Sequence, residues 1–244
     1  MTLIEKTASK EPQNMPAEEV LQQAMARMQA EIIRLNPDQT SDADSSWQER
    51  KSAQTRIAIL AAGVKCLSKH GYAKTTTQLV AATAKISRGA MLHHYSTKLD
   101  LISSVIDYVF FRRMKLLLGE IAKLSDKERL DISGAVTVYW NWVQTPEFDA
   151  YLELSMASRK DQELLAVFEK RAIELDEGAL DQIPIFFPEW AGLSRKKLRL
   201  ANDMIVVTLH GLHVQRLINS DAKRRQEIRD LVSRVLLMLR ENEL

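Results

Sequence analysis

Residues 88–95, RGAMLHHY, carry side chains suited to binding nucleic acid. Arg88 can donate a pair of hydrogen bonds to guanine, the commonest specific contact between a protein and DNA. His93 can reach a base edge from the same segment, while Gly89 and Ala90 are small enough to let the backbone approach a surface closely. This combination predicts a short helix that reads DNA.

The neighbouring sequence predicts the elements that must hold this helix. An apolar stripe at three- and four-residue spacing indicates a helix over 50–70, and Gly71 supplies its left-handed stop. A short helix over 78–84 and a turn at Lys85 and Ile86 then lead to the segment 88–95. Helix, glycine turn, short helix, turn and short helix is the layout of a helix-turn-helix unit.

Phosphate and base contacts are expected from different members of this unit. Thr77, Tyr95 and Lys98 suit phosphate positioning. For Lys98 there is a further reason, because a lysine at a helix N-terminus opposes the helix dipole unless an anion meets it. Tyr95 can equally belong to the core. The full set of candidate DNA contacts is Thr75, Thr77, Ser87, Arg88, Gly89, Ala90, Leu92, His93, His94, Tyr95 and Lys98.

Two of these polar residues, Thr75 and Ser87, have a second interpretation as helix caps. One of the threonines 75–77 can cap the helix over 78–84, and Ser87 can cap the next helix. Thr97 is expected to cap a longer helix that starts at residue 98. Capping and DNA contact therefore both stay open for Thr75 and Ser87.

Charge is distributed unevenly along a chain whose net charge is only +2. Residues 49–98 contain nine Lys and Arg against one acidic residue, which gives +8, whereas residues 1–46 contain four against eight, which gives −4. A basic block in a near-neutral chain is typical of a module that binds a polyanion, although a solvated basic face is the alternative.

Residues 56–102 carry motifs that resemble the DNA-binding domain of the TetR family of transcriptional regulators. The whole domain implied by this resemblance spans about 50–102. The matching motifs are Gly71-Tyr72, Thr75-Thr76-Thr77, Leu79-Val80-Ala81-Ala82-Thr83-Ala84, Ser87-Arg88-Gly89, Met91-Leu92-His93-His94-Tyr95 and Thr97-Lys98. Leu92 departs from the family, which usually has a DNA-contacting tyrosine there, so contacts are expected to shift toward His93 and His94. The resemblance implies an all-helical C-terminal domain with a ligand pocket and a dimer interface built from the last two helices.

The rest of the chain also has a helical pattern, so we expect an all-α protein: a three-helix DNA-binding domain followed by a helical ligand-binding and dimerisation domain. Its expected domains are an extension over 1–46, the helix-turn-helix domain over 47–98 and the effector domain over 99–244. Long apolar stripes within 194–241 support the implied homodimer interface. The expected C-terminal helices span about 98–123, 127–144, 147–159, 161–180, 194–219 and 222–241.

Aromatic and histidine residues in this half are the candidates for lining an effector pocket. They are Tyr139, Trp142, Phe148, Tyr151, His210 and His213. Ordinary core packing is the alternative for each of them, because pockets and cores share these residue types. The two histidines lie three apart on one helix but lack a companion ligand motif, so we expect no metal and no cofactor.

An amphipathic helix is expected over 17–36, followed by a polar linker. Its acidic surroundings make it a poor DNA-reaching arm, so it should pack elsewhere on the molecule or on a protein partner. The single cysteine, Cys66, and the absence of a long apolar run or signal peptide predict a cytoplasmic protein associated with the nucleoid and not with a membrane.

These features together predict a DNA-binding regulator, a repressor released from a double-stranded operator by a small apolar or aromatic effector. A regulator controlled by a protein partner through the helix 17–36 is one alternative. A helical enzyme on a retained fold is the other, although no phosphate loop, nucleophile elbow or other catalytic motif is present and no catalytic residue is expected.

Overall fold

The computed structural model describes residues 17–37, 46–130, 132–218 and 220–241, and every regular element in these ranges is helical. The all-α prediction is therefore confirmed. The helices are α1 (Ala17–Leu35), α2 (Trp47–Lys74), α3 (Thr77–Ala84), α4 (Arg88–His94), α5 (Lys98–Ile121), α6 (Asp126–Arg129), α7 (Ile132–Val143), α8 (Pro146–Ser158), α9 (Gln162–Phe186), the 3-10 turn η1 (Pro188–Trp190), α10 (Arg195–Gln215) and α11 (Ala222–Glu241).

Local capping chemistry explains the ends of the first long helix. α2 begins three residues earlier than expected, because Ser46 and Glu49 form a capping box in which each side chain accepts a hydrogen bond from the other's backbone N–H. At its other end the helix stops at Gly71, as predicted, with a positive φ of 77° but an extended ψ of 167° in place of the left-handed helical value. Residues 72–74 form a separate turn beyond this kink.

Two expected helix boundaries in the C-terminal half are wrong. The segment expected over 127–144 is divided into α6 and α7. The two helices lie so close together that a Cβ on Gly134 of α7 would lie 2.4 Å from the carbonyl oxygen of Glu128 in α6. The helix expected to end at residue 180 continues as α9 through Pro184 to Phe186. Burial of Leu180 and Phe186 holds this last turn despite the missing proline N–H.

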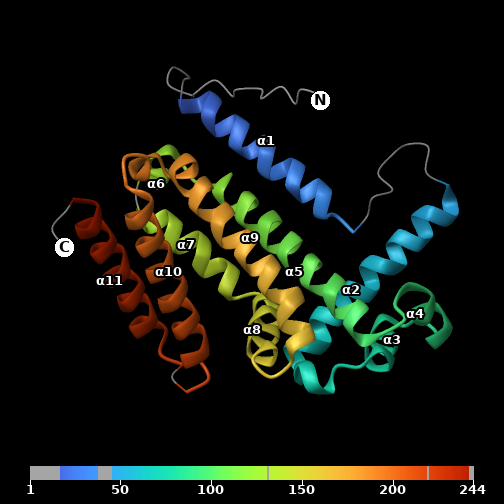
Figure 1. Ribbon diagram of the computed structural model, residues 1–244. Helices are drawn as coiled ribbons and strands as arrows, with labels where there is room; N and C mark the ends of the chain where they lie inside the picture. Colours follow the sequence, from blue (N-terminus) through green and yellow to red (C-terminus); the bar gives the residue numbers. More distant parts are fainter. Residues whose placement is uncertain (1–16, 38–45, 131, 219, 242–244) are drawn as a thin grey trace, which may run out of the picture.

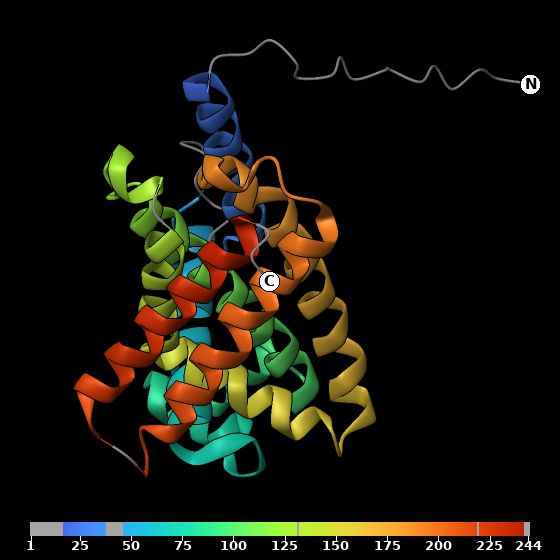
Figure 2. The same ribbon diagram turned by 90° about the vertical axis from the view of Figure 1, so that its left-hand side faces the viewer.

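The helices are arranged around α5 and α9, which pack side by side (Figure 1). α1 lies across both of them, so the expected packing of this helix on the molecule is confirmed. The unit α2–α4 lies at one end, while α10 and α11 lie at the opposite side. Figure 2 shows the last two helices side by side on the surface, with no other helix in front of them. Within the described ranges no helix is both long and apolar enough to cross a bilayer.

Candidate DNA interface and effector cavity

Helices α3 and α4 form a rigid unit with one polar outer face. Buried Val80 and Met91 lock the two helices together from inside. The turn between them passes through Lys85, whose φ is 58°, and ends at Ser87, whose hydroxyl accepts a hydrogen bond from Ala90 N at 3.1 Å. The predicted cap at Ser87 is confirmed, and this cap leaves the side chain at the exposed start of α4.

Eight of the candidate DNA contacts lie along this outer face or beside it. The exposed ones are Ser87, Arg88, Gly89, Leu92 and His93, and the partly exposed ones are Thr77, Ala90 and His94. Burial, nearby His93 and Arg56 together lower the pKa of His94, so its ring is neutral near pH 7. The His93 and His94 rings meet edge to face with their centroids 5.5 Å apart.

The other three candidates are engaged within the protein. Thr75 is completely buried, and its hydroxyl donates to the Gly71 carbonyl at 2.8 Å. Tyr95 lies in the core, where burial raises its pKa. Lys98 Nζ donates to the Tyr72 carbonyl at 2.7 Å, which occupies one of the three donors of its ammonium group. Burial therefore places Thr75 and Tyr95 behind the DNA-facing surface, whereas the partly buried Lys98 stays a candidate phosphate contact. The N-cap of α3 is the neighbouring Thr76.

Tyr72 connects the end of α2 to the rest of the molecule. Its backbone N–H donates to Glu153 Oε1 of α8 at 2.7 Å, and its hydroxyl donates to Asp161 Oδ2 at 2.9 Å. Burial and Asp161 raise the pKa of Tyr72 to about 12. The Lys98 ammonium also lies over the Tyr72 ring, 3.9 Å from its centroid. This joint fixes α2 against α5, α8 and the start of α9.

Two adjoining cavities lie between α1, α5 and α9. The larger measures about 250 Å³ and the smaller about 100 Å³, and both are lined by Met28, Arg113 and Gln182. Asp107, Arg171 and Glu174 line only the larger cavity, and the smaller one extends along apolar side chains of α5, α7 and α9. The apolar side chains that line the smaller cavity include Leu117, Ile121, Val138, Ile183, Phe186 and Phe187.

Of the six candidate effector residues, Tyr139 is the one that lines these cavities. Trp142 and Phe148 are fully buried core residues, and Tyr151 packs on Phe148 with its ring 6.0 Å away. The remaining two are the histidines of α10, whose rings both lie 4.7 Å from that of Phe148. The structure therefore assigns most of this set to an aromatic core cluster behind the cavity wall.

The two histidines of α10 have different partners. His210 shares a 2.9 Å hydrogen bond with the Tyr139 hydroxyl, whereas His213 Nε2 lies 2.7 Å from Asp149 Oδ1. Arg216 also pairs with Asp149, which ties α10 to α8. Across the part of the chain that the structure describes, no three His, Cys, Asp or Glu side chains are grouped closely enough to hold a metal ion.

His210 is expected to make the folded state sensitive to acid. Burial, with smaller contributions from Arg113 and His213, lowers its pKa to about 4, from the ordinary histidine value of 6.5. The unfolded chain therefore takes up a proton near pH 6.5 and the folded chain only near pH 4, so stability present above pH 6.5 is lost as the pH falls. Urea unfolding of the wild type at pH 7.5 and 5 should show a loss of about 2 kcal/mol from this residue.

Urea unfolding of the His210→Gln variant at the same two pH values separates the contribution of His210 from that of other groups. This variant should lose less stability than the wild type between the two pH values, whereas His70→Gln at an exposed position of α2 should keep the wild-type difference. An unchanged pH dependence in His210→Gln would show that other groups cause the acid sensitivity.

Arg113 and Met28 are among the cavity residues that the sequence interpretation missed. Arg113 carries a signal that could have identified it: it lies three residues after Phe110 and four before Leu117, on an apolar stripe of α5. A charge within such a stripe is unusual unless it has a task. Met28 carried no such signal, because its burial depends on where α1 crosses α5 and α9.

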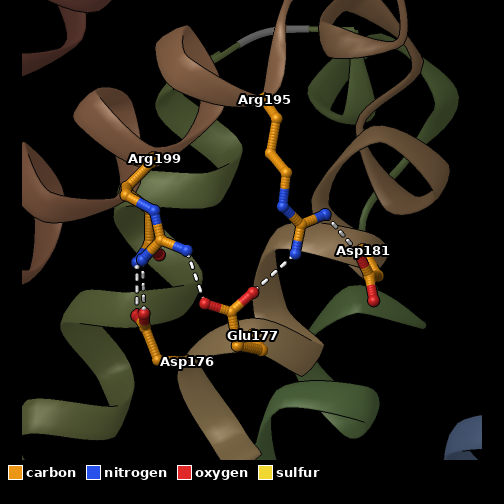
Figure 3. A network of polar contacts seen from close by, with 6 residues as sticks. Asp176, Glu177, Asp181, Arg195 and Arg199 are labelled. Atoms are coloured by element: carbon orange, nitrogen blue, oxygen red, sulfur yellow. Dashed lines mark hydrogen bonds and ion pairs between the residues drawn. The ribbon is translucent and has the colours of Figure 1, made fainter. Parts of the chain in front are cut away.

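A polar network fixes α10 to α9, the helix that lines both cavities. Figure 3 shows Glu177 between two arginines, with Arg195 Nη2 at 2.6 Å and Arg199 Nη2 at 2.5 Å from its carboxylate oxygens. Arg195 also reaches Asp181 at 2.7 Å, and Arg199 reaches Asp176 at 3.0 Å. Because these groups are substantially exposed, the network sets the register of the two helices more than it stabilises the fold.

The outer surface of α10 and α11 carries several exposed apolar side chains among charged ones. Val207 is 71% exposed, and Leu217 and Ile218, just after α10, are more than 80% exposed. Most of the exposed side chains on α10 follow a three- and four-residue spacing, so they form one stripe along the helix. The exposed apolar residues of this surface are Leu200, Val207, Val214, Leu217, Ile218, Leu231 and Met238, and we call them the α10–α11 face.

The all-helical fold and the helix-turn-helix unit with its basic, outward-facing α4 define a DNA-binding transcriptional regulator. Residues 59–105 match the family described as bacterial regulatory proteins, tetR family. The resemblance seen in the motifs is thereby confirmed over this segment, and the chain is a transcriptional regulator with a TetR-type DNA-binding domain.

Relatives agree with this class. The chain is 24% identical over 183 residues to the HTH-type transcriptional regulator CymR of Pseudomonas putida, covering 75% of this chain and 89% of that protein. A transcriptional regulator from Pseudomonas aeruginosa PAO1 has the same fold, with a TM-score of 0.58, 20% identity and coverage of 80% of this chain and 93% of the other. The structure of the multidrug binding protein EbrR in complex with imidazole matches with a TM-score of 0.53 and 19% identity. The match covers 78% of this chain and 92% of that chain. The first two of these proteins are named as transcriptional regulators.

Proposed function

We propose that this chain acts as a homodimeric repressor that binds a palindromic operator and releases it when a small effector enters the cavity between α1, α5 and α9. The DNA contacts come from α3 and α4, with Arg88 and His93 at base edges. Thr77, Ser87 and His94 lie beside them, and the small residues at the start of α4 permit close approach to the duplex. Leu92, 49% exposed, is available for an apolar contact such as a thymine methyl.

The observation that carries this proposal is the course of α5. One continuous helix of 24 residues begins at the DNA-binding unit, where Lys98 is bonded to Tyr72, and then lines both cavities through Arg113 and Leu117. A ligand that prefers a different position of α5 would therefore move the DNA-binding unit as well. Release then follows from a population shift toward the geometry that does not fit the operator.

The α10–α11 face supports the homodimer. Several exposed apolar side chains on two adjacent helices are typical of a protein–protein interface. Pairing two copies through α10 and α11 makes a four-helix arrangement and carries two α4 helices to successive major grooves. The expected domain division, with the DNA-binding domain over 47–98 and the effector domain over 99–244, belongs to this proposal.

Control by a protein partner through α1 receives less support. α1 packs on α5 and α9, and its Met28 is 4% exposed at the cavity wall. Because α1 is packed against its own chain, it serves to close the cavity and leaves less of its surface for a protein partner.

The test is binding to the DNA upstream of the protein's own gene, measured by fluorescence anisotropy across a salt series. Arg88→Ala should weaken operator binding at least tenfold, since an arginine–guanine contact discriminates by about 1–3 kcal/mol. Binding to a scrambled duplex should change much less. Wild-type binding should also fall steeply with salt, because phosphate contacts release counterions.

Lys170→Ala is the matched control, because it removes an exposed positive charge from α9, outside the DNA-binding unit. Its operator affinity should equal that of the wild type. Equal loss for the operator and the scrambled duplex in Arg88→Ala would place this residue on phosphate instead of a base. Operator binding that does not depend on Arg88 would contradict the proposed reading helix.

A further inference from the structure

Arg113 is a cation without a carboxylate partner at the wall of both cavities. Its Nε is buried and has no hydrogen-bond partner. Within the described part of the chain no carboxylate forms an ion pair with it, and its guanidinium is instead flanked by the Tyr139 and Trp142 rings, at 5.4 and 5.8 Å from their centroids. Aromatic faces stabilise a positive charge, but they do not satisfy the N–H donors.

The other charges of the larger cavity are already paired. Arg171 Nε lies 2.6 Å from Asp107 Oδ1, and its Nη1 lies 2.8 Å from Glu174 Oε2. These two carboxylates are therefore held away from Arg113 by a cation of their own. In the smaller cavity Arg113 is the one charged residue among the lining side chains, and most of the others are apolar.

We propose, on the basis of the function proposed above, that the effector is a small organic acid whose carboxylate pairs with Arg113 and whose apolar or aryl tail occupies the smaller cavity. A guanidinium presents two parallel N–H donors that match the two oxygens of a carboxylate. Gln182 adds a polar group at the shared wall, and Phe186 and Phe187 supply aromatic surface for the tail. Both cavities are smaller than the 300–1,000 Å³ typical of drug-sized ligands, which favours a compact, single-ring acid.

Isothermal titration calorimetry on the full chain without DNA tests this assignment. The probes are phenylacetate, 3-phenylpropionate and 4-phenylbutyrate, each compared with its uncharged amide. At least one acid should bind the wild type, and its amide should bind at least tenfold more weakly. Arg113→Met should weaken binding of that acid about tenfold to a hundredfold, the range expected for a charge-assisted hydrogen bond.

Arg112→Met is the matched control, since it changes the adjacent arginine. Arg112 lines neither cavity, and its Nε lies 3.0 Å from Glu147 Oε1. Its affinity for the acid should stay unchanged. Unliganded Arg113→Met should melt no lower than the wild type, because the change removes a partly buried charge that lacks an ionic partner. Arg113→Lys keeps the charge without the planar fork and should retain part of the affinity.

Equal binding of acid and amide by the wild type, full affinity in Arg113→Met, or failure of all three acids to bind would each overturn the proposal. The acid–amide comparison needs no variant, so it stands even where a substitution impairs folding. Operator binding by the unliganded protein is measured separately: its absence would count against the proposed function alone, while carboxylate binding would still support the site.

Discussion

Gly211→Glu is expected to make the protein monomeric and to abolish tight operator binding. Gly211 lies at an exposed position of α10 between Val207 and Val214, and a Cβ placed there meets no atom within 4 Å. The chain alone can therefore hold a side chain at this position. In a symmetric dimer through the α10–α11 face, the substitution buries an uncompensated carboxylate from each subunit, at a cost of about 3–5 kcal/mol for each one.

Sedimentation velocity measures the first part of this prediction, and anisotropy with the upstream DNA measures the second. The dimer dissociation constant should rise at least about a hundredfold, and operator affinity should fall by about 10²–10⁴ because two linked reading heads become independent. Gly119→Glu is the matched control: it makes the same change at an exposed glycine of α5 that is equally open. A dimeric Gly211→Glu protein would show that the two copies meet through another surface.

Phe148→Ala is expected to cause the largest loss of stability within one chain. The Phe148 side chain is 0% exposed, and its ring contacts those of Trp142, Tyr151, His210 and His213 with centroid separations of 4.7–6.0 Å. Removing a buried phenylalanine ring leaves a cavity and costs about 3–5 kcal/mol. The affected cluster joins α7, α8 and α10, so the wall behind Tyr139 should loosen as well.

Urea unfolding followed by circular dichroism, at one fixed protein concentration, measures this loss. Keeping the concentration fixed matters because dimerisation stabilises the folded state by mass action. Leu165→Ala serves as the control, since this leucine on α9 is 39% exposed and leaves no closed cavity; it should cost less than about 1 kcal/mol. A loss below 1 kcal/mol in Phe148→Ala would contradict the central position assigned to its ring.

The two expected results address different links between cavity and operator. The Gly211→Glu substitution tests whether dimerisation through the α10–α11 face sets the separation of the two DNA-binding units. Phe148 tests whether the aromatic cluster supports the helix that faces the cavity. The network at Glu177 connects the two, because it fixes α9 at the cavity to α10 at the proposed interface (Figure 3).

Local signals in the sequence were enough to predict the DNA-binding unit. The stop at Gly71, the caps at Ser87 and Thr97 and the short helices between them all appear where expected. Each depends on residues within about four positions of one another, because capping and helix periodicity act over a single turn. The apolar stripes of α1 and of the last helices have the same origin.

The sequence by itself thus determined the all-α class, the helix-turn-helix unit and the polar residues that face outward from it. Only the tertiary structure decided that Thr75 is buried, that Lys98 is bonded to Tyr72 and that Phe148 belongs to the core. It also placed Arg113 at a cavity wall between helices that are far apart in the chain. The physical reason is that burial and cavity lining depend on which faces of distant helices meet, whereas a cap or an apolar stripe is complete within one helix.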